Sequence, residues 1–244
     1  MTDKISIICP TYNRRKFLPY LIYQFNYQIY PKHLLYLYIL DDSENSNIDL
    51  INTINDQNLR SRIIYIHDKV KRTIGAKRNI LNSIVQNIGT DYIVCFDDDD
   101  YYPPNKISND IPRLKSSNKL IGGISTVLIY YPHLKQIYRF GMKLNYITRR
   151  YYDGHASNGT FIYDVKYLKY NSYNNNDTYA EEKQFLRNYE IKLCRFSIDS
   201  YILISHNTNT VEKLQFIKRG VLLNYKLEDI INDKFLLNFY NNLK

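Results

Sequence analysis

The chain has 244 residues, enough for one sizeable domain with a buried core, and no Gly/Ser- or Pro-rich linker divides it. Its formal net charge of +9 is compatible with anionic partners, although AT-rich codons explain its abundance of Asn, Ile, Lys and Tyr equally well. Neither a signal peptide nor an apolar run of the roughly 20 residues that span a bilayer is found, and three cysteines without a CxxC pair indicate a reducing compartment. We therefore expect a cytoplasmic protein without a membrane span.

The first half of the sequence alternates between short apolar runs and amphipathic segments. The β-branched run "ISIICP" is typical of a buried strand that ends at a proline. The same reasoning predicts strands at 5–10, 34–42, 61–67 and 91–96, and helices at 17–25, 46–56 (N-cap Ser46 or Asn47) and 73–87. This alternation predicts a doubly wound parallel sheet, in which ligands bind beyond the carboxyl ends of the strands.

The second half of the sequence is less regular. Its patterns predict strands at 120–132 and 134–144 that can pair as a hairpin, a mobile polar loop at 171–178, a helix at 178–190 with Thr178 as N-cap, a strand from Tyr201 into a polar loop, and a terminal helix at 227–243. We expect one compact α/β domain with a mixed, mostly parallel central sheet flanked by helices.

Four consecutive aspartates, Asp97 to Asp100, directly follow the predicted strand at 91–96. Adjacent carboxylates repel one another, so they need a compensating cation. Carboxylates at a strand end suit Mg²⁺ or Mn²⁺, which often complete their coordination with substrate phosphates. A metal with a diphosphate would therefore explain an acidic cluster in a basic protein, and a solvated acidic loop is the alternative.

Four segments, "CPTYNR", "YILDDSENS", "GAKRN" and "DYIVCFDDDDYYPPNKI", resemble in order and spacing the motifs of the family 2 glycosyltransferases. The resemblance implies the Rossmann-like GT-A fold, a nucleotide-sugar donor that is most often UDP-linked, a divalent cation, and inversion at the anomeric carbon. The acceptor would be a hydroxyl of a glycan, protein or lipid. Within one domain, 1–100 would bind the nucleotide, 101–220 the metal and acceptor, and 221–244 would form a helical segment.

The resemblance also assigns donor-binding roles to individual residues. Asp97 and Asp99 would be the two carboxylates of the family pattern D-x-D-D, with Asp99 as the main metal ligand and Asp98 at the ribose. Pro10, Thr11 and Tyr12 would flank the base and ribose, and Asp41 or Asp42 would accept a hydrogen bond from the base. Arg14 would also bind the nucleotide. Near the start of the helix at 73–87, Lys71, Arg72 and Lys77 are expected to contact phosphates, and Arg78 would brace the acidic loop.

An inverting transfer needs a general base for the acceptor hydroxyl. In the family this base is the Asp of an "ED" pair, and here Glu182 stands at that position after Glu181. Asp177 is the second candidate. The alternative is that both glutamates only stabilise a helix N-terminus.

Two later motifs complete the expected site. The loop "GHASNGTFIYD" resembles the family loop that lines the sugar and acceptor site, which would place His155, Asn158 and Gly159 there. His206 is expected as a further metal ligand, because a neutral imidazole suits Mn²⁺. Phosphate contacts are also considered for its polar neighbours Asn207, Asn209 and Thr210.

Three other functions stay open at this point. A sugar nucleotidyltransferase would use similar carboxylates but release pyrophosphate. A nucleic-acid-binding protein would use the basic clusters at 14–16, 69–72, 149–150 and 218–219 together with some of the 26 tyrosines, yet these are spread evenly and the most pronounced local feature is acidic, so we expect no nucleic acid. A binding module that keeps the fold without turnover is the third. The Tyr-rich hairpin at 129–138 would either mediate homo-oligomers or pack internally.

Overall fold

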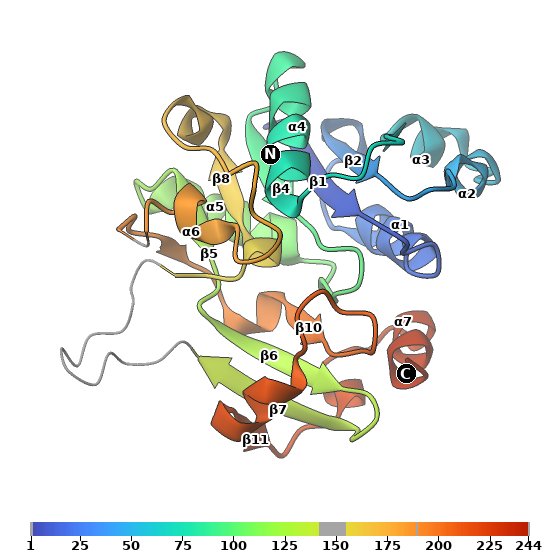
Figure 1. Cartoon of the computed structure of the whole chain (residues 1–244), viewed down its shortest axis with the longest axis vertical. Coiled ribbons are helices and arrows are strands. Elements are labelled where there is room, and N and C mark those ends of the chain that lie inside the picture. Colours follow the sequence, from blue (N-terminus) through green and yellow to red (C-terminus); the bar gives the residue numbers. More distant parts are fainter. Residues whose placement is uncertain (1, 142–154, 189, 244) are drawn as a thin grey trace.

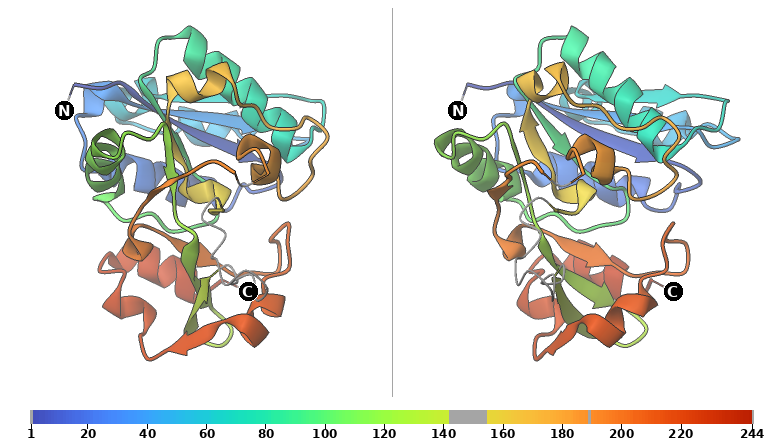
Figure 2. Two further views of the ribbon diagram at one scale, coloured as in Figure 1. Left: turned by 90° about the vertical axis from the view of Figure 1, so that its left-hand side faces the viewer. Right: turned by 60° about the vertical axis from the view of Figure 1, so that its left-hand side comes forward.

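Two β-sheets organise the chain in the computed structural model, which describes residues 2–141, 155–188 and 190–243 (Figure 1). The seven-stranded sheet has the order β3-β2-β1-β4-β8-β5-β9, and the four-stranded sheet has the order β10-β6-β7-β11. Their bounds are β1 Ile5–Thr11, β2 Leu35–Asp41, β3 Ile63–His67, β4 Tyr92–Cys95, β5 Ile121–Gly123, β6 Thr126–Tyr131, β7 Gln136–Gly141, β8 Ile162–Asp164, β9 Cys194–Arg195, β10 Ile202–Ile204 and β11 Val221–Leu223. Figure 2 shows the smaller sheet below the larger one from two further sides.

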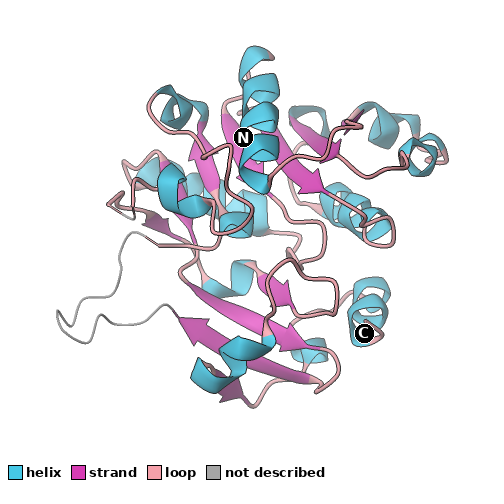
Figure 3. Cartoon of the chain, in the orientation of Figure 1, coloured by secondary structure: helices cyan, strands magenta, loops and turns pink. Residues whose placement is uncertain are grey.

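Helices cover both faces of the larger sheet (Figure 3). The α-helices are α1 Leu18–Tyr27, α2 Ile48–Asn52, α3 Gln57–Ser61, α4 Ile74–Asn87, α5 Lys106–Ser116, α6 Glu182–Phe185 and α7 Lys234–Asn241; the 3₁₀ helices are η1 Lys32–Leu34, η2 Asn158–Thr160, η3 Val165–Lys169, η4 Ile198–Ser200, η5 Leu214–Arg219 and η6 Leu227–Asp229. No helix in these described ranges is long and apolar enough to cross a membrane.

Strand periodicity explains how the sheet separates two apolar clusters. In β1, Ile7 packs in the cluster that contains residues of α1 and α5, whereas Ile8 packs in the cluster that contains residues of α4. Strands β3, β2, β1 and β4 are parallel, and β8 adds to β4 in antiparallel orientation. The predicted α/β class and mostly parallel sheet are confirmed, and the parallel strands bring the segments after β1, β2 and β4 to one edge.

The predicted strand at 120–132 is in fact two strands that belong to different sheets. β5 pairs with β8 and β9, and β6 pairs with β7 and β10. Gly122 and Gly123 allow this crossing, because a Cβ would lie 2.3 Å from the Phe196 ring at Gly122 and 2.8 Å from Ala156 Cβ at Gly123. A period-2 pattern cannot reveal that a run changes sheets, and this change forms the connection between the two halves.

The β6–β7 hairpin confirms the predicted pairing, and the described part of β7 ends at Gly141. Tyr131 is buried and meets Tyr138 edge-on at 5.5 Å between ring centroids. These two tyrosines of the hairpin therefore pack inside the protein. Homo-oligomerisation through the hairpin stays a prediction. The rest of the predicted strand, 142–144, and the basic pair at 149–150 lie outside the described residues.

Predicted helices in three places are wrong in extent. The helix at 178–190 is reduced to α6, its N-cap is Glu181 rather than Thr178, and Ala180 (φ 54°) and Arg187 (φ 48°) have left-handed backbones on either side of it. The segment at 46–56 holds only α2, after the N-cap residue Asn47, and α3 follows as a separate helix. The segment at 227–243 divides into η6 and α7. Sequence analysis also missed α5, β8, β9 and β11.

The polar loop at 171–178 packs against the first turns of α4. Asn79 Nδ2 donates to the Tyr173 carbonyl at 2.8 Å, and the Gly75 N–H donates to the Asp177 carbonyl at 3.2 Å. A Cβ at Gly75 would lie 2.0 Å from the Asn174 carbonyl oxygen. The absence of a side chain at this position therefore allows the loop to approach the helix.

We predict that Gly75→Ala destabilises the protein by about 1–3 kcal/mol, because the new methyl group displaces backbone. In a helix without this contact, the same change would stabilise by about 1 kcal/mol. A loss of stability would therefore identify the clash between the new methyl group and the Asn174 carbonyl. Urea unfolding measures the difference, with Ser83→Ala at an exposed position of α4 as the control. Unchanged or higher stability of Gly75→Ala would contradict this packing.

Candidate active site

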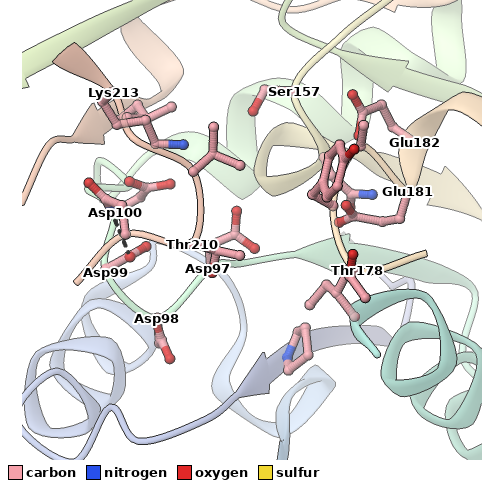
Figure 4. A pocket seen from close by; sticks show the side chains of 18 of the residues that line it. Asp97, Asp98, Asp99, Asp100, Ser157, Thr178, Glu181, Glu182, Thr210 and Lys213 are labelled. Carbon is pink, nitrogen blue, oxygen red and sulfur yellow. Dashed lines mark hydrogen bonds between the residues drawn. The ribbon is translucent and has the colours of Figure 1, made fainter. Parts of the chain in front are cut away.

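A cleft of about 1030 Å³ lies between the two sheets, within the size range of a small-molecule site. Its lining comes from the carboxyl ends of β1 and β4, the start of α4, the segment around α6, and the upper side of the second sheet. Figure 4 shows the aspartates and the glutamate pair on opposite sides of this cleft. The predicted site residues that line it are Pro10, Thr11, Tyr12, Arg14, Lys71, Arg72, Lys77, Arg78, Asp97, Asp98, Asp99, His155, Asn158, Glu181, Glu182, Asn209 and Thr210.

The four aspartates are not equivalent, because each has different partners. Asp97 is the most exposed of the first three and pairs with Arg78, whose Nη2 lies 2.9 Å from its Oδ1. Asp98 is buried, accepts a hydrogen bond from the Thr11 hydroxyl and lies 3.9 Å from Arg14. Burial, together with the charge of Asp99, raises the pKa of the Asp98 carboxyl.

Asp99 faces His206. Their Oδ2 and Nε2 atoms are 2.9 Å apart, and Asn209 Nδ2 lies 3.2 Å from the same oxygen. Burial would raise the pKa of Asp99, but the His206 hydrogen bond and charge lower it below its ordinary value. Two groups of Thr208 lie near His206 Nδ1: the backbone N–H at 3.2 Å and the hydroxyl oxygen at 2.9 Å. Nδ1 can therefore accept a hydrogen bond from Thr208 or donate one to it, depending on the tautomer.

Asp100 has a structural role in the described contacts. Its carboxylate accepts hydrogen bonds from the Tyr201 hydroxyl and, at 2.9 Å, from the Ile204 N–H of β10. Its carbonyl accepts from Gln24 at 3.0 Å and from Tyr240 at 2.8 Å. Burial raises its pKa. Asp100 thus ties the acidic loop to the second sheet, α1 and α7.

Arg78 joins the two sides of the cleft. It is 2% exposed, and its Nε donates to Glu181 Oε1 at 2.8 Å while Nη2 binds Asp97. Its Nη1 has no hydrogen-bond partner in the described part of the chain. The geometry agrees with the expectation that Arg78 braces the acidic loop, and adds that it fixes Glu181 as well.

Glu181 and Glu182 differ in their partners and in their exposure. Burial raises the pKa of Glu181, which is held by Arg78. Glu182 is the more exposed of the two and lies 3.3 Å from Nε2 of His155. Asp177 is not among the cleft-lining residues described, and its carboxylate accepts from Asn174 Nδ2 at 3.0 Å. Glu182 is therefore the better placed of the predicted bases.

Basic side chains lie beside the predicted nucleotide position. Lys71 Nζ is 4.2 Å from the Tyr12 ring centroid. Lys77 is buried, and its Nζ donates to the Thr11 carbonyl at 2.9 Å and to Asp42 at 2.7 Å. Lys77 thus reaches the cleft with a protein partner already bound, rather than as a free phosphate ligand.

Asp41 and Asp42 lie behind the cleft rather than in its described lining. Asp41 is fully buried and accepts hydrogen bonds from the Ser43 N–H at 2.9 Å, and from Asn47 Nδ2 and the Tyr65 hydroxyl, each at 2.7 Å. Asp42 binds Lys77 and the Arg72 N–H. The structure therefore does not bring either carboxylate to the position expected for reading the base.

The predicted sugar loop reaches the cleft only in part. Asn158 is buried with no partner for its Nδ2 among the described residues, so it can donate to a ligand. Gly159 lies behind it, where a Cβ would be 2.5 Å from Asp97 Oδ2. Its small size serves the acidic loop rather than direct ligand contact.

Sequence analysis missed several residues that line the cleft from the second sheet and its loops. They bear no motif, and they reach the cleft because the chain passes to the second sheet twice, after β5 and again after β9: Ser125, Val127, Ile129, Phe140, Leu203, Lys213, Phe216 and Arg219. Ser157 and Thr178 complete the opposite side.

The donor atoms present suit a divalent cation bound jointly with substrate. Only two of the predicted ligands, Asp99 and His206, are in contact, and Asp97 points to Arg78 instead. Among the described residues, no group of three or more His, Cys, Asp and Glu side chains forms a metal site. A carboxylate with an imidazole nevertheless fits Mn²⁺, and Mg²⁺ commonly takes one or two protein ligands and completes its coordination with phosphates.

The fold and the acid-lined cleft together define the class. Solved glycosyltransferase structures have a similar fold: S. aureus TarS 1-349 (TM-score 0.59, 15% identity, 82% of this chain and 60% of that one) and its complex with UDP-GlcNAc (0.60, 16%, 85% and 60%). Mannosyltransferase PcManGT from Pyrobaculum calidifontis, with GDP-Man and Mn²⁺, gives 0.62 and 10%, covering 90% and 60%. The fold is therefore that of the GT-A glycosyltransferases.

The family follows from the sequence comparison. The model described as Glycosyl transferase family 2 matches residues 6–172, and the chain belongs to that family. A comparison with curated protein sequences gives no match. The chain spans 60% of the length of each of the three solved structures described above.

We predict that Asp41→Asn destabilises the protein at neutral pH by about 1.5–3 kcal/mol, the range for hydrogen bonds to a charged group. Burial would raise the pKa of Asp41, but hydrogen bonds from Ser43, Tyr65 and Asn47 lower it below 3.8 in the folded protein. Its stabilisation is therefore complete above the unfolded pKa of about 4 and is lost as the pH falls through the folded pKa.

Urea unfolding of both proteins between pH 7 and pH 3 tests this prediction. The difference in unfolding free energy should shrink below about pH 4. Glu44→Gln removes an exposed carboxylate nearby and serves as the control. A difference that is the same at every pH would mean that the Asp41 charge is unimportant.

Proposed function

We propose that the protein is a metal-dependent, inverting glycosyltransferase that moves a sugar from a nucleotide-sugar donor to a hydroxyl of a glycan, protein or lipid. The observation that carries the proposal is the position of Asp98 and Asp99 on one side of a single cleft and of Glu182 on the other. UDP is the expected nucleotide, since TarS was solved with UDP-GlcNAc and with UDP, and GDP is second, since the mannosyltransferase holds GDP-Man. Cytoplasmic location stays a prediction.

Asp99 and His206 are the residues that would hold Mn²⁺ or Mg²⁺. When bound, the cation stabilises the negative charge that develops on the leaving diphosphate. Arg14 lies 3.8 Å from Asp99 and close to Asp98, so it limits repulsion within the cluster when no cation is present. Tyr12 and Lys71 offer a ring face and a cation to the nucleotide.

Glu182 is the proposed general base. It accepts the proton of the acceptor hydroxyl while that oxygen bonds to the anomeric carbon from the side opposite the diphosphate. The bond from the anomeric carbon to the diphosphate oxygen breaks, and its electron pair leaves with the diphosphate. Glu182 suits this role because its carboxylate lines the cleft, whereas Glu181 is bound to Arg78.

We expect UDP to raise the melting temperature in the presence of Mn²⁺ and not in its absence, because a ligand of the native state stabilises it by mass action. Asp99→Ala should abolish the Mn²⁺-dependent shift, whereas Glu212→Ala, at an exposed acid, should retain it. Thermal unfolding with UDP, GDP, CDP and ADP measures both. A shift with GDP alone would change the donor, and no shift with any nucleotide would contradict the proposal.

We expect Glu182→Gln to keep Mn²⁺-dependent donor binding but to lower the transfer rate by about 10²–10⁴-fold, the usual contribution of a general base. Glu190→Gln, at an exposed acid, is the matched control. The readouts are the nucleotide melting shift and nucleoside diphosphate release with acceptor. Normal transfer would remove the base assignment, and pyrophosphate release would point to a nucleotidyltransferase.

A further inference from the structure

The second-sheet wall of the cleft combines apolar surface with two cations. Phe140 of β7 and Phe216 of η5 lie 4.7 Å apart between ring centroids, beside the cleft-lining β6 residues Val127 and Ile129. Lys213 and Arg219 border this surface, and Figure 4 shows Lys213 directed into the pocket. We refer to Lys213 and Arg219, with the Phe140–Phe216 surface, as the cationic wall.

Most other cations of the cleft already have an acidic partner. Arg14 lies near Asp98 and Asp99, Lys77 binds Asp42, and Arg78 binds Asp97 and Glu181. In the described part of the chain, neither Lys213 nor Arg219 forms a salt bridge or a side-chain hydrogen bond, although the charge of Lys213 contributes to the lowered pKa of Asp99. The cationic wall is therefore a local excess of positive charge.

Donor binding would not neutralise this excess. The diphosphate of a nucleotide sugar carries two negative charges, and a divalent cation carries two positive ones, so the pair adds no net charge to the cleft. The proposed position of the divalent cation, and with it the diphosphate of the donor, is next to Asp99 and His206. Lys213 and Arg219 thus remain available to an anion in the second substrate.

We propose that the acceptor carries a phosphate or carboxylate group and that Lys213 and Arg219 bind it while the acceptor hydroxyl reaches Glu182. This inference rests on the proposed glycosyl transfer. A guanidinium and an ammonium group together suit an oxyanion, because the first binds it through two parallel N–H groups and the second as a point charge. The Phe140–Phe216 surface covers the apolar part of the acceptor next to its anion.

The test compares three compounds that share one ring: glucose 6-phosphate, glucuronate and glucose. Their dissociation constants are measured by titration calorimetry on protein saturated with UDP and Mn²⁺, so that the diphosphate position is occupied. We expect at least one anionic compound to bind about tenfold or more tightly than glucose, and the stronger one identifies phosphate or carboxylate as the recognised group.

The double variant Lys213→Ala with Arg219→Ala should lose this preference while it still binds UDP with Mn²⁺. Because the charge of Lys213 acts on Asp99, the affinity for UDP and Mn²⁺ is measured in the same variant. Lys218→Ala removes a neighbouring exposed lysine of η5 that is not in the described lining and should keep the preference. Equal affinity for the three compounds, no measurable binding, or a preference that survives in the double variant would overturn the proposal.

Loss of UDP and Mn²⁺ affinity in the double variant would also overturn it, since the two cations would then serve the donor. If the wild type itself binds no nucleoside diphosphate, the proposed function fails instead. The same titrations on unloaded protein then decide separately whether the cationic wall binds oxyanions.

Discussion

The buried guanidinium of Arg78 is the interaction on which the arrangement of the cleft depends. It contacts Asp97 after β4 and Glu181 before α6, segments more than eighty residues apart in the sequence. Removing one partner of a buried ion pair costs about 3–5 kcal/mol, because the remaining charge is left without compensation in a low dielectric. Arg78 therefore links the acidic loop to the glutamate pair across the cleft, and it compensates the charge of acids that are buried together.

This also explains how four adjacent carboxylates coexist. Asp97 is paired with Arg78, Asp99 faces His206 with Arg14 nearby, and Asp100 is bound by donors from β10 and from Tyr201. Asp98 accepts a hydrogen bond from the Thr11 hydroxyl and lies 3.9 Å from Arg14, but burial and the charge of Asp99 raise its pKa. Cation binding would thus act on a cluster whose charge is already divided among several partners.

The sequence predicts the first half of the fold well, because period-2 apolar runs alternate with amphipathic helices and the acids stand at strand ends. Asp99 stands at a strand end, whereas Thr11 and Glu182 are expected in the site from the resemblance to the family motifs; all three line the cleft. It does not reveal that the Asp41 carboxylate accepts hydrogen bonds from Ser43, Asn47 and Tyr65, since those contacts depend on the packing of α2 against β3.

The second half could not be predicted to the same extent. α6 has only four residues between left-handed turns, and its position comes from Arg78 rather than from helix propensity. Gly122 and Gly123 at the end of β5 leave room for side chains that are distant in the sequence, and no local pattern marks the change of sheet that follows them. The residues of the cationic wall lie after that change of sheet in the sequence, and no local sequence pattern predicts that they line the cleft.

The division into two sheets also means that substitutions in the two parts of the cleft have different consequences. The first turns of α4 carry Lys77 and Arg78 and hold the loop before α6, so substitutions there alter both the acidic loop and the glutamate pair. Side chains on β6, β7 and η5 line the same cleft without contacting those groups in the described interactions. Under the proposed function, mutation of the second sheet would therefore change which substrates bind while the groups proposed for the reaction stay in place.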